Sequence, residues 1–179
     1  MLEAFGGHIL ILSGSPGAGK TTTAEALARL PGGRKVHLHS DDYWGNIKTG
    51  HIDPWLPEAD TQNRMVMEIA AMVADRYAQE GYFVVLDGVI RPWSLPTFLK
   101  LSRPLHYVVL RPTADESIAR CLARGGDSLT DAEVVGDLHA QFADLAPYEH
   151  HRLTTDTLDR DTTLARVIEA LESEKFRLK

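Results

Sequence analysis

Short hydrophobic runs alternate with longer segments of helical period along the whole chain. The runs predict strands at residues 9–12, 36–39, 82–86 and 106–110, with a last strand at 151–155. The periodic segments predict helices at residues 22–30, 61–80, 95–102, 113–125, 130–145 and 162–175. Strands that alternate with helices in this way predict an α/β fold built on a parallel sheet.

Two kinds of signal define the helices within this pattern. The helix at 61–80 is predicted from Met65, Ile69, Met72 and Val73, which recur at spacings of three and four residues. The sequences Thr-Ala-Asp-Glu at 113–116 and Thr-Asp-Ala-Glu at 130–133 are capping boxes, which predict that a helix starts at each.

The connection between the first strand and the first helix is a complete G-x-x-x-x-G-K-[ST] phosphate-binding loop. It consists of Gly14, Ser15, Pro16, Gly17, Ala18, Gly19, Lys20 and Thr21, and Thr22 follows it. Backbone N–H groups of such a loop surround nucleotide phosphates, Lys20 reaches the β- and γ-phosphates, and the Thr21 hydroxyl coordinates Mg²⁺. A strand before it and a helix after it are the context that this motif requires. The sequence therefore predicts that the chain binds ATP and Mg²⁺.

Size, charge and cysteine content narrow the protein class. One domain over residues 1–179 is expected, and a chain of this length is too short for an AAA-type or multidomain ATPase. The net charge of −6 argues against a nucleic-acid partner. The lone Cys121, in a helical pattern, excludes an internal disulfide and is expected to be a small buried side chain. No signal peptide or membrane span is visible, so a cytoplasmic protein without a membrane partner is expected.

Phosphoryl transfer also requires carboxylates and cations, and the chain offers candidates after its strands. Asp41 and Asp42 follow the second strand; Asp41 is the preferred base because it is nearer the strand, while Asp42 caps the next turn or assists. Asp87 ends the third run and is a candidate to hold Mg²⁺, although an ordinary turn also produces this pattern. Gly88 would allow close approach of substrate, and Arg91 is a candidate for binding an anionic group on the acceptor.

Two further segments are candidates for covering the ligands. Residues 43–59 hold two of the three tryptophans and have no periodicity, so an acceptor-side loop is expected at 43–60, with Trp44 contacting the substrate. The alternative is that these tryptophans anchor a structural loop. Arg120 and Arg124 share a helix face before a short lid at 125–130; alternatively they only complement the helix dipole. The histidines show no metal-binding spacing, although His37 and His39 share one strand face.

These motifs resemble the P-loop small-molecule kinases, which include gluconate kinase, chloramphenicol phosphotransferase, adenylylsulfate and nucleoside kinases and the kinase domain of polynucleotide kinase. The resemblance covers essentially the whole chain. It implies a three-layer fold with a five-stranded parallel sheet in the order 2-3-1-4-5 and helices on both faces. It also implies that Asp41 is the acceptor-side base, that Arg120 and Arg124 contact nucleotide phosphates, and that adenine lies near Thr155. The 43–59 segment matches no acceptor motif, and Arg64 and Arg91 are the candidates for the arginine pair of a nucleotide acceptor site.

Together these features predict an ATP- and Mg²⁺-dependent phosphotransferase. Its acceptor would be a hydroxyl or phosphate of a small molecule, such as a sugar acid, a nucleoside or nucleotide, or an antibiotic-like compound. Two alternatives stay open: a nucleotide-dependent switch, ATPase or binding protein, and a polynucleotide 5′-kinase. The chain has no Asn-Lys-x-Asp motif, which argues against a GTPase. The oligomeric state is not predicted.

Overall fold

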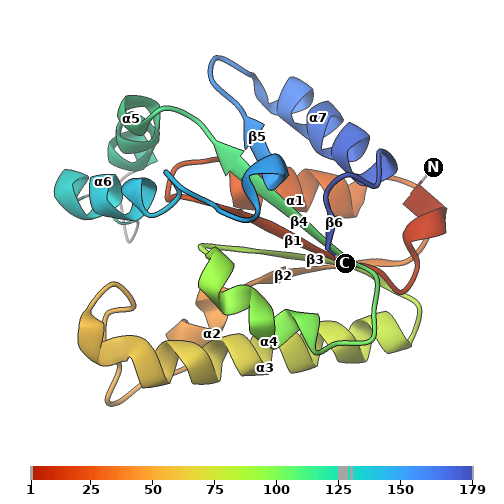
Figure 1. Cartoon of the computed structure of the whole chain (residues 1–179), viewed down its shortest axis with the longest axis horizontal. Helices are drawn as coiled ribbons and strands as arrows, with labels where there is room; N and C mark the ends of the chain where they lie inside the picture. The colour runs from red at the N-terminus through yellow and green to blue at the C-terminus, as the bar shows by residue number, and fades with distance from the viewer. Residues whose placement is uncertain (1, 125–128, 130, 179) are drawn as a thin grey trace.

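A computed structural model describes residues 2–124, 129 and 131–178, except for the side chain of Arg124. A twisted sheet runs through the middle, with helices against both of its faces (Figure 1). Helix α1 (Lys20–Arg29) and helix α7 (Arg160–Glu172) lie on one face, and α2 (Asp41–Gly45), α3 (Asp60–Gln79) and α4 (Leu95–Leu99) lie on the other. The two remaining helices, α5 (Ala114–Arg124) and α6 (Ala132–Ala140), pack together beside one end of the sheet.

The order of the strands is β2-β3-β1-β4-β5, which confirms the predicted order. The strands are β1 (Ile9–Gly14), β2 (Lys35–His39), β3 (Phe83–Gly88), β4 (Leu105–Arg111) and β5 (Arg152–Thr154). All four pairings among them are parallel. The prediction of five strands was incomplete, because β6 (Arg177–Leu178) adds a sixth, antiparallel strand beside the start of β4. Two residues are too short a run to give a strand signal in the sequence.

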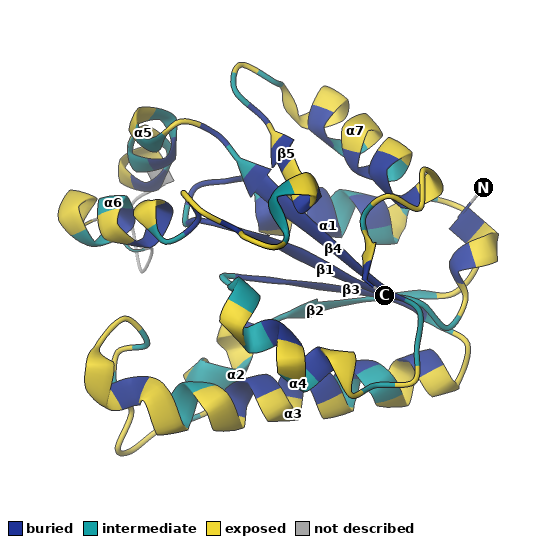
Figure 2. Ribbon diagram, in the orientation of Figure 1, coloured by how far each residue is buried: buried dark blue, intermediate teal, exposed yellow. Residues whose placement is uncertain are grey.

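Alternate side chains of the central strands build two separate cores, one on each face. Ile9 and Ile11 of β1 pack with α3 and α4, whereas Leu10 and Leu12 pack with α1 and α7. Neighbouring residues of a strand point to opposite faces, so a strand that is buried on both sides reads as a continuous apolar run. Figure 2 shows the resulting buried sheet between helices that are exposed on their outer sides.

Helix α3 is present where it was predicted, but it buries a different face. Its side chains toward the sheet are Val66, Met67, Ala70, Ala71, Ala74 and Ala78. Met65, Ile69 and Met72, which defined the predicted apolar stripe, are 45%, 40% and 71% exposed. Small alanine side chains allow the helix to approach the sheet closely, and a periodicity search weighted toward large side chains overlooks them.

Other boundaries also differ from the predictions. The start of the segment expected to be irregular contains α2, and its end contains the short 3₁₀ helix η2 (Pro57–Ala59). Helix α6 begins after Asp131, whose carboxylate accepts from the backbone N–H groups of Glu133 and Val134, so the cap lies one residue later than predicted. The expected lid at 125–130 lies outside the described residues except for Leu129.

Candidate functional site

The phosphate-binding loop connects β1 to α1 and rests on helix α5. Gly17 has φ 76°, and a Cβ on it would lie 2.3 Å from the carbonyl oxygen of Ser117, so this position requires glycine. The Lys20 side chain is buried, and its Nζ donates to the carbonyl oxygen of Ser15 at 2.9 Å. The lysine therefore lies folded back over the loop, where the phosphates of a bound nucleotide would be.

Beneath the loop, Thr21 and Asp87 come together as predicted for a Mg²⁺ site. The Thr21 hydroxyl donates to Asp87 Oδ2 at 2.6 Å, and Asp87 is completely buried at the end of β3. Two residues that the sequence did not assign complete the cluster. His37 Nε2 lies 2.6 Å from Asp87 Oδ1, and its Nδ1 lies 3.1 Å from Glu25 Oε2. The hydrogen bond to Asp87 raises the pKa of His37.

The oxygen atoms of Thr21 and Asp87 are suitable ligands for Mg²⁺. Mg²⁺ prefers oxygen ligands and is usually held by one or two protein groups, with phosphates and water filling the other positions. Thr21 supplies a hydroxyl and Asp87 a carboxylate at the same point, directly beside the phosphate loop. Among the described residues no set of three acidic, histidine or cysteine side chains forms a complete metal cage. The residues therefore fit a metal ion that is shared with nucleotide phosphates.

Asp41 is placed by a close contact between the second and third strands. Ser40 is fully buried, and a Cβ on Gly88 would come within 1.8 Å of its hydroxyl oxygen. Gly88 therefore serves the approach of Ser40 rather than the approach of substrate, which corrects the prediction. Helix α2 begins directly after Ser40, so Asp41 and Asp42 lie in its first turn. His39 Nε2 lies 3.6 Å from Asp41 Oδ2, and His39 Nδ1 lies 3.4 Å from Asp42 Oδ1.

A cavity of about 900 Å³ brings the two sets of predicted residues together. Its lining includes these predicted site residues: Pro16, Gly17, Gly19, Lys20, Thr21, Thr22, Asp41, Trp44, Arg64 and Arg91. Asp42 is not part of the lining, which favours Asp41 as the group that faces a ligand. Gly14, Ser15 and Ala18 lie within the loop behind this surface, and Asp87 lies beneath Thr21.

The aromatic and basic residues predicted on the acceptor side of the cavity differ in their exposure to solvent and in their hydrogen-bond and ion-pair partners. Trp44 Nε1 donates to Asn63 Oδ1 at 2.9 Å, which fixes the indole against α3. Arg64 is exposed and pairs with Asp60 at 2.5 Å. Arg91 is largely shielded from solvent, and its guanidinium carbon lies 5.5 Å from the centre of the Trp93 ring. Burial lowers the pKa of Arg91.

Of the residues predicted to contact the nucleotide at its far side, Arg120 and Thr155 do not line the cavity. Arg120 donates to the carbonyl oxygen of Gly17 at 3.5 Å and pairs with Glu116, so it contacts the loop itself. Thr155 is buried after β5, and its hydroxyl has no hydrogen-bond partner among the described residues. The side chain of Arg124 lies outside the described part of the chain. The roles of these three residues stay predictions.

Sequence reasoning missed five residues of the site, which are Glu25, His37, His39, Trp55 and Trp93. His37 and His39 share a strand face, as noted, but that face turned out to point at Asp87, 2.6 Å and 3.9 Å away. Trp55 and Trp93 line the cavity with Trp44, so all three tryptophans of the chain surround it. The two-residue spacing of His37 and His39 could have indicated that both face the site. The three tryptophans are distant in sequence, so only the folded structure shows that they line one cavity. Cys121 is buried, as expected.

Comparison with known proteins places this geometry in context. A family model described as an AAA domain matches residues 9–145, so the expectation that the chain is too short for an AAA-type protein was wrong. A tRNA dimethylallyltransferase from Anaeromyxobacter sp. (strain Fw109-5) is 29% identical over 174 residues. That match covers 92% of this chain but 54% of the relative, so the chain spans about half the length of that protein.

Solved structures with the same fold include two kinases. A sugar kinase from Janibacter sp. HTCC2649 superposes with a TM-score of 0.70 at 15% identity, covering 92% of this chain and 94% of that one. Shikimate kinase from Acinetobacter baumannii, solved with shikimate, superposes with a TM-score of 0.63 at 21% identity, covering 97% of both chains. At this level of identity the similarity confirms the P-loop fold. Within the described residues no helix is both long and apolar enough to cross a membrane.

Proposed function

This chain belongs to the AAA domain family, and we propose that it is an ATP- and Mg²⁺-dependent phosphotransferase acting on a small molecule. The observation that carries the proposal is the shared cavity. Lys20 and Thr21 line one side of it, and Asp41, Trp44 and Arg91 line the other. A donor nucleotide on the phosphate loop and an acceptor beside Asp41 would therefore meet in one cavity, and direct phosphoryl transfer requires the two to be held side by side.

Each residue then has a defined task. The carboxylate of Asp41 accepts the proton of the acceptor hydroxyl as that oxygen forms its bond to the γ-phosphorus. The bond between the γ-phosphorus and the bridging oxygen breaks, and ADP leaves with its electron pair. Lys20 neutralises negative charge on the transferred group, and Arg120 supports the loop through Gly17. Thr21 and Asp87 would hold Mg²⁺, which supplies further positive charge to the phosphate oxygens.

The test is ADP release by the pure protein with ATP, Mg²⁺ and a panel of acceptors. Sugars, sugar acids, nucleosides, nucleotides, antibiotics and 5′-hydroxyl oligonucleotides are compared with a reaction that lacks acceptor. Turnover that rises with one small-molecule acceptor, and that disappears in Lys20→Ala, supports the proposal. Slow hydrolysis that no acceptor stimulates would identify a switch or ATPase instead. Stimulation by oligonucleotides alone would identify a polynucleotide 5′-kinase, which the net charge of −6 disfavours.

One comparison favours a second candidate, transfer of a dimethylallyl group to tRNA. It rests on the 29% identity to the Anaeromyxobacter protein over 92% of this chain. The acidic net charge argues against it. Incubation with tRNA and dimethylallyl diphosphate, followed by analysis of the tRNA for the added group, separates the two candidates. Modified tRNA would replace the phosphotransferase proposal.

A further inference from the structure

Arg91 is a largely shielded cation in the acceptor half of the cavity, and no described carboxylate pairs with it. Its Nε is buried and has no hydrogen-bond partner in the described part of the chain, and no described carboxylate forms an ion pair with its guanidinium. Its recorded partner is the face of Trp93, at 5.5 Å. A charge that is partly removed from water and has no ionic partner is unfavourable in a folded protein unless a ligand compensates it. Burial also lowers the pKa of this arginine, as expected for an uncompensated cation.

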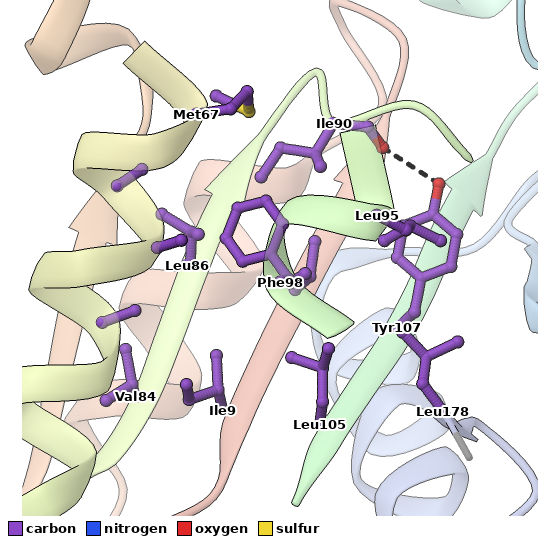
Figure 3. Packing of buried hydrophobic residues seen from close by; sticks show 14 of the residues in the cluster. Ile9, Met67, Val84, Leu86, Ile90, Leu95, Phe98, Leu105, Tyr107 and Leu178 are labelled. Atoms are coloured by element: carbon purple, nitrogen blue, oxygen red, sulfur yellow. Dashed lines mark hydrogen bonds between the residues drawn. The ribbon is translucent and has the colours of Figure 1, made fainter. Parts of the chain in front are cut away.

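The backbone before Arg91 holds this cation in a fixed position. The Ile90 carbonyl oxygen accepts hydrogen bonds from the Ser13 hydroxyl at 2.6 Å and from the Tyr107 hydroxyl at 2.9 Å. The Ile90 N–H donates to the same Ser13 oxygen at 3.1 Å. Figure 3 shows the bond to Tyr107 among packed core side chains. Arg91 therefore starts from a segment bound to both β1 and β4, and a ligand would not need to order it first.

Aromatic surface surrounds the same cation. Trp93 and Trp55 are 64% and 40% exposed, although both line the cavity. Together with Arg91 they also line an adjoining space of about 380 Å³. Large indole surfaces that stay in contact with water favour an apolar or planar ligand that would cover them. Arg64 does not offer a comparable site, because it is exposed and already pairs with Asp60.

We propose that the phosphoryl acceptor is an amphipathic anion: a carboxylate or phosphate monoester attached to an apolar ring that carries the accepting hydroxyl. Arg91 binds the anionic group, Trp93 and Trp55 cover the ring, and the hydroxyl is directed to Asp41. The inference rests on the proposed function, but anion binding at Arg91 can be measured without catalysis. A neutral sugar would supply no negative charge to Arg91 and would cover less of the indole surface.

Binding is tested in the absence of ATP by quenching of tryptophan fluorescence at constant ionic strength. The probes are 4-(hydroxymethyl)benzoate, 4-(hydroxymethyl)phenyl phosphate and the neutral isostere 4-(hydroxymethyl)benzamide. We expect one or both anions to bind at least about tenfold more tightly than the amide, and their ratio identifies carboxylate or phosphate as the preferred group. Equal binding of the amide and the anions would overturn the inference.

The role of Arg91 is tested with Arg91→Met, and Arg76→Gln is the matched control. Arg76 lies on the exposed side of α3, where it pairs with Glu80 at 2.7 Å, so its loss changes net charge equally without touching the cavity. We expect Arg91→Met to weaken binding of the anion roughly 30-fold or more, and Arg76→Gln to leave it unchanged. Unchanged binding by Arg91→Met would overturn the inference.

Thermal unfolding separates a ligand-binding arginine from a structural one. Because Arg91 has no ion pair among the described residues, Arg91→Met should unfold at the same temperature as the wild type or higher. A lower unfolding temperature would show that Arg91 stabilises the fold and would contradict the inference that it lacks a compensating partner.

The anion site and the proposed phosphotransferase activity can fail independently of each other. Acceptor-stimulated turnover with neutral sugars alone would overturn the anion and leave the phosphotransferase. Anion binding that depends on Arg91, without turnover on any acceptor, would support the anion site and remove the phosphotransferase.

Discussion

The sheet carries a pair of histidines at each end, and the two pairs have opposite surroundings. Toward the carboxyl ends of the strands, His37 and His39 face Asp87, and the hydrogen bond to this carboxylate raises the pKa of His37. At the amino ends, His8 Nδ1 lies 3.0 Å from His106 Nε2, beside Phe5. Burial lowers the pKa of both, and that of His106 falls to about 4.

The difference follows from what each end of the sheet must do. At the carboxyl ends, polar groups pair with one another around a cavity, where charge can be used on a ligand. At the amino ends, aromatic packing and the short strand β6 close the sheet, and a polar ring is tolerated there only in its neutral form. Changes at the first end should therefore affect activity with little effect on stability, and changes at the second end should do the reverse.

The largest effect is expected from Lys20→Ala at the carboxyl ends. The variant removes the charge directed at the transferred phosphoryl group, so turnover should fall by about 10²- to 10³-fold. Its Nζ donates to the loop carbonyl of Ser15, outside the two hydrophobic cores, so we expect a smaller effect on the unfolding temperature than on turnover. Acceptor-stimulated ADP release and thermal unfolding are measured on the same preparation. More than about a tenth of wild-type turnover would show that this loop is not the catalytic one.

Asp41→Asn should follow, with a loss of about 10²-fold in acceptor-dependent turnover, the scale of a lost general base. The amide keeps the shape of the side chain but cannot take up a proton, so ATP affinity should stay close to that of the wild type. Asp42→Asn is the matched control, since Asp42 shares the first turn of α2 but does not line the cavity. A larger loss in the control would make Asp42 the base.

The contrast between the two ends also explains what the sequence could predict. Strands buried on both faces appear as continuous apolar runs, and the phosphate loop is a local pattern of glycines, lysine and threonine. Both were predicted correctly because their signals lie in consecutive residues. The inward face of α3 was not, because alanines form it while Met65, Ile69 and Met72 remain exposed.

The acceptor half of the cavity depends on contacts that no local pattern encodes. Trp44 belongs to α2 and Trp93 to the 3₁₀ helix η3 (Pro92–Ser94), almost fifty residues apart in sequence, and only the fold brings them to one space. Arg91 was recognised as a candidate, but only the folded arrangement shows that its Nε lacks a partner among the described residues and that Ile90 beside it is bound to Ser13 and Tyr107. Charge alone could not separate it from Arg64.

At the amino ends, the prediction concerns acid stability. The pKa of His106 is about 4 in the folded protein, whereas an unfolded histidine has a pKa near 6.5, so the unfolded chain binds more protons between these values. Stability should therefore fall as the pH falls below about 6.5, by roughly 2 kcal/mol between pH 7 and pH 5. Urea unfolding at both pH values measures it.

His106→Leu should remove much of this pH dependence, while His150→Gln, at an exposed position, should retain it. Equal pH dependence in wild type and His106→Leu would assign the effect to another group. Neither variant should alter turnover at neutral pH, because His106 lies at the end of the sheet opposite the cavity. Loss of turnover in a folded His106→Leu protein would break the separation between the two ends.

The smallest effect on activity is expected from substitution of His37, and it tests whether this histidine orients the Asp87 carboxylate. His37 connects Asp87 to Glu25 from beneath the phosphate loop, so we expect it to fix the orientation of the Asp87 carboxylate. Such supporting bonds typically change metal affinity by about 10-fold or more. His37→Ala should therefore raise the Mg²⁺ concentration needed for half-maximal turnover by about tenfold. His37→Gln, whose amide N–H can reach Asp87, should recover most of the loss. Equal effects of alanine and glutamine would mean that His37 contributes packing alone, and the two histidine pairs would then differ in environment but not in role.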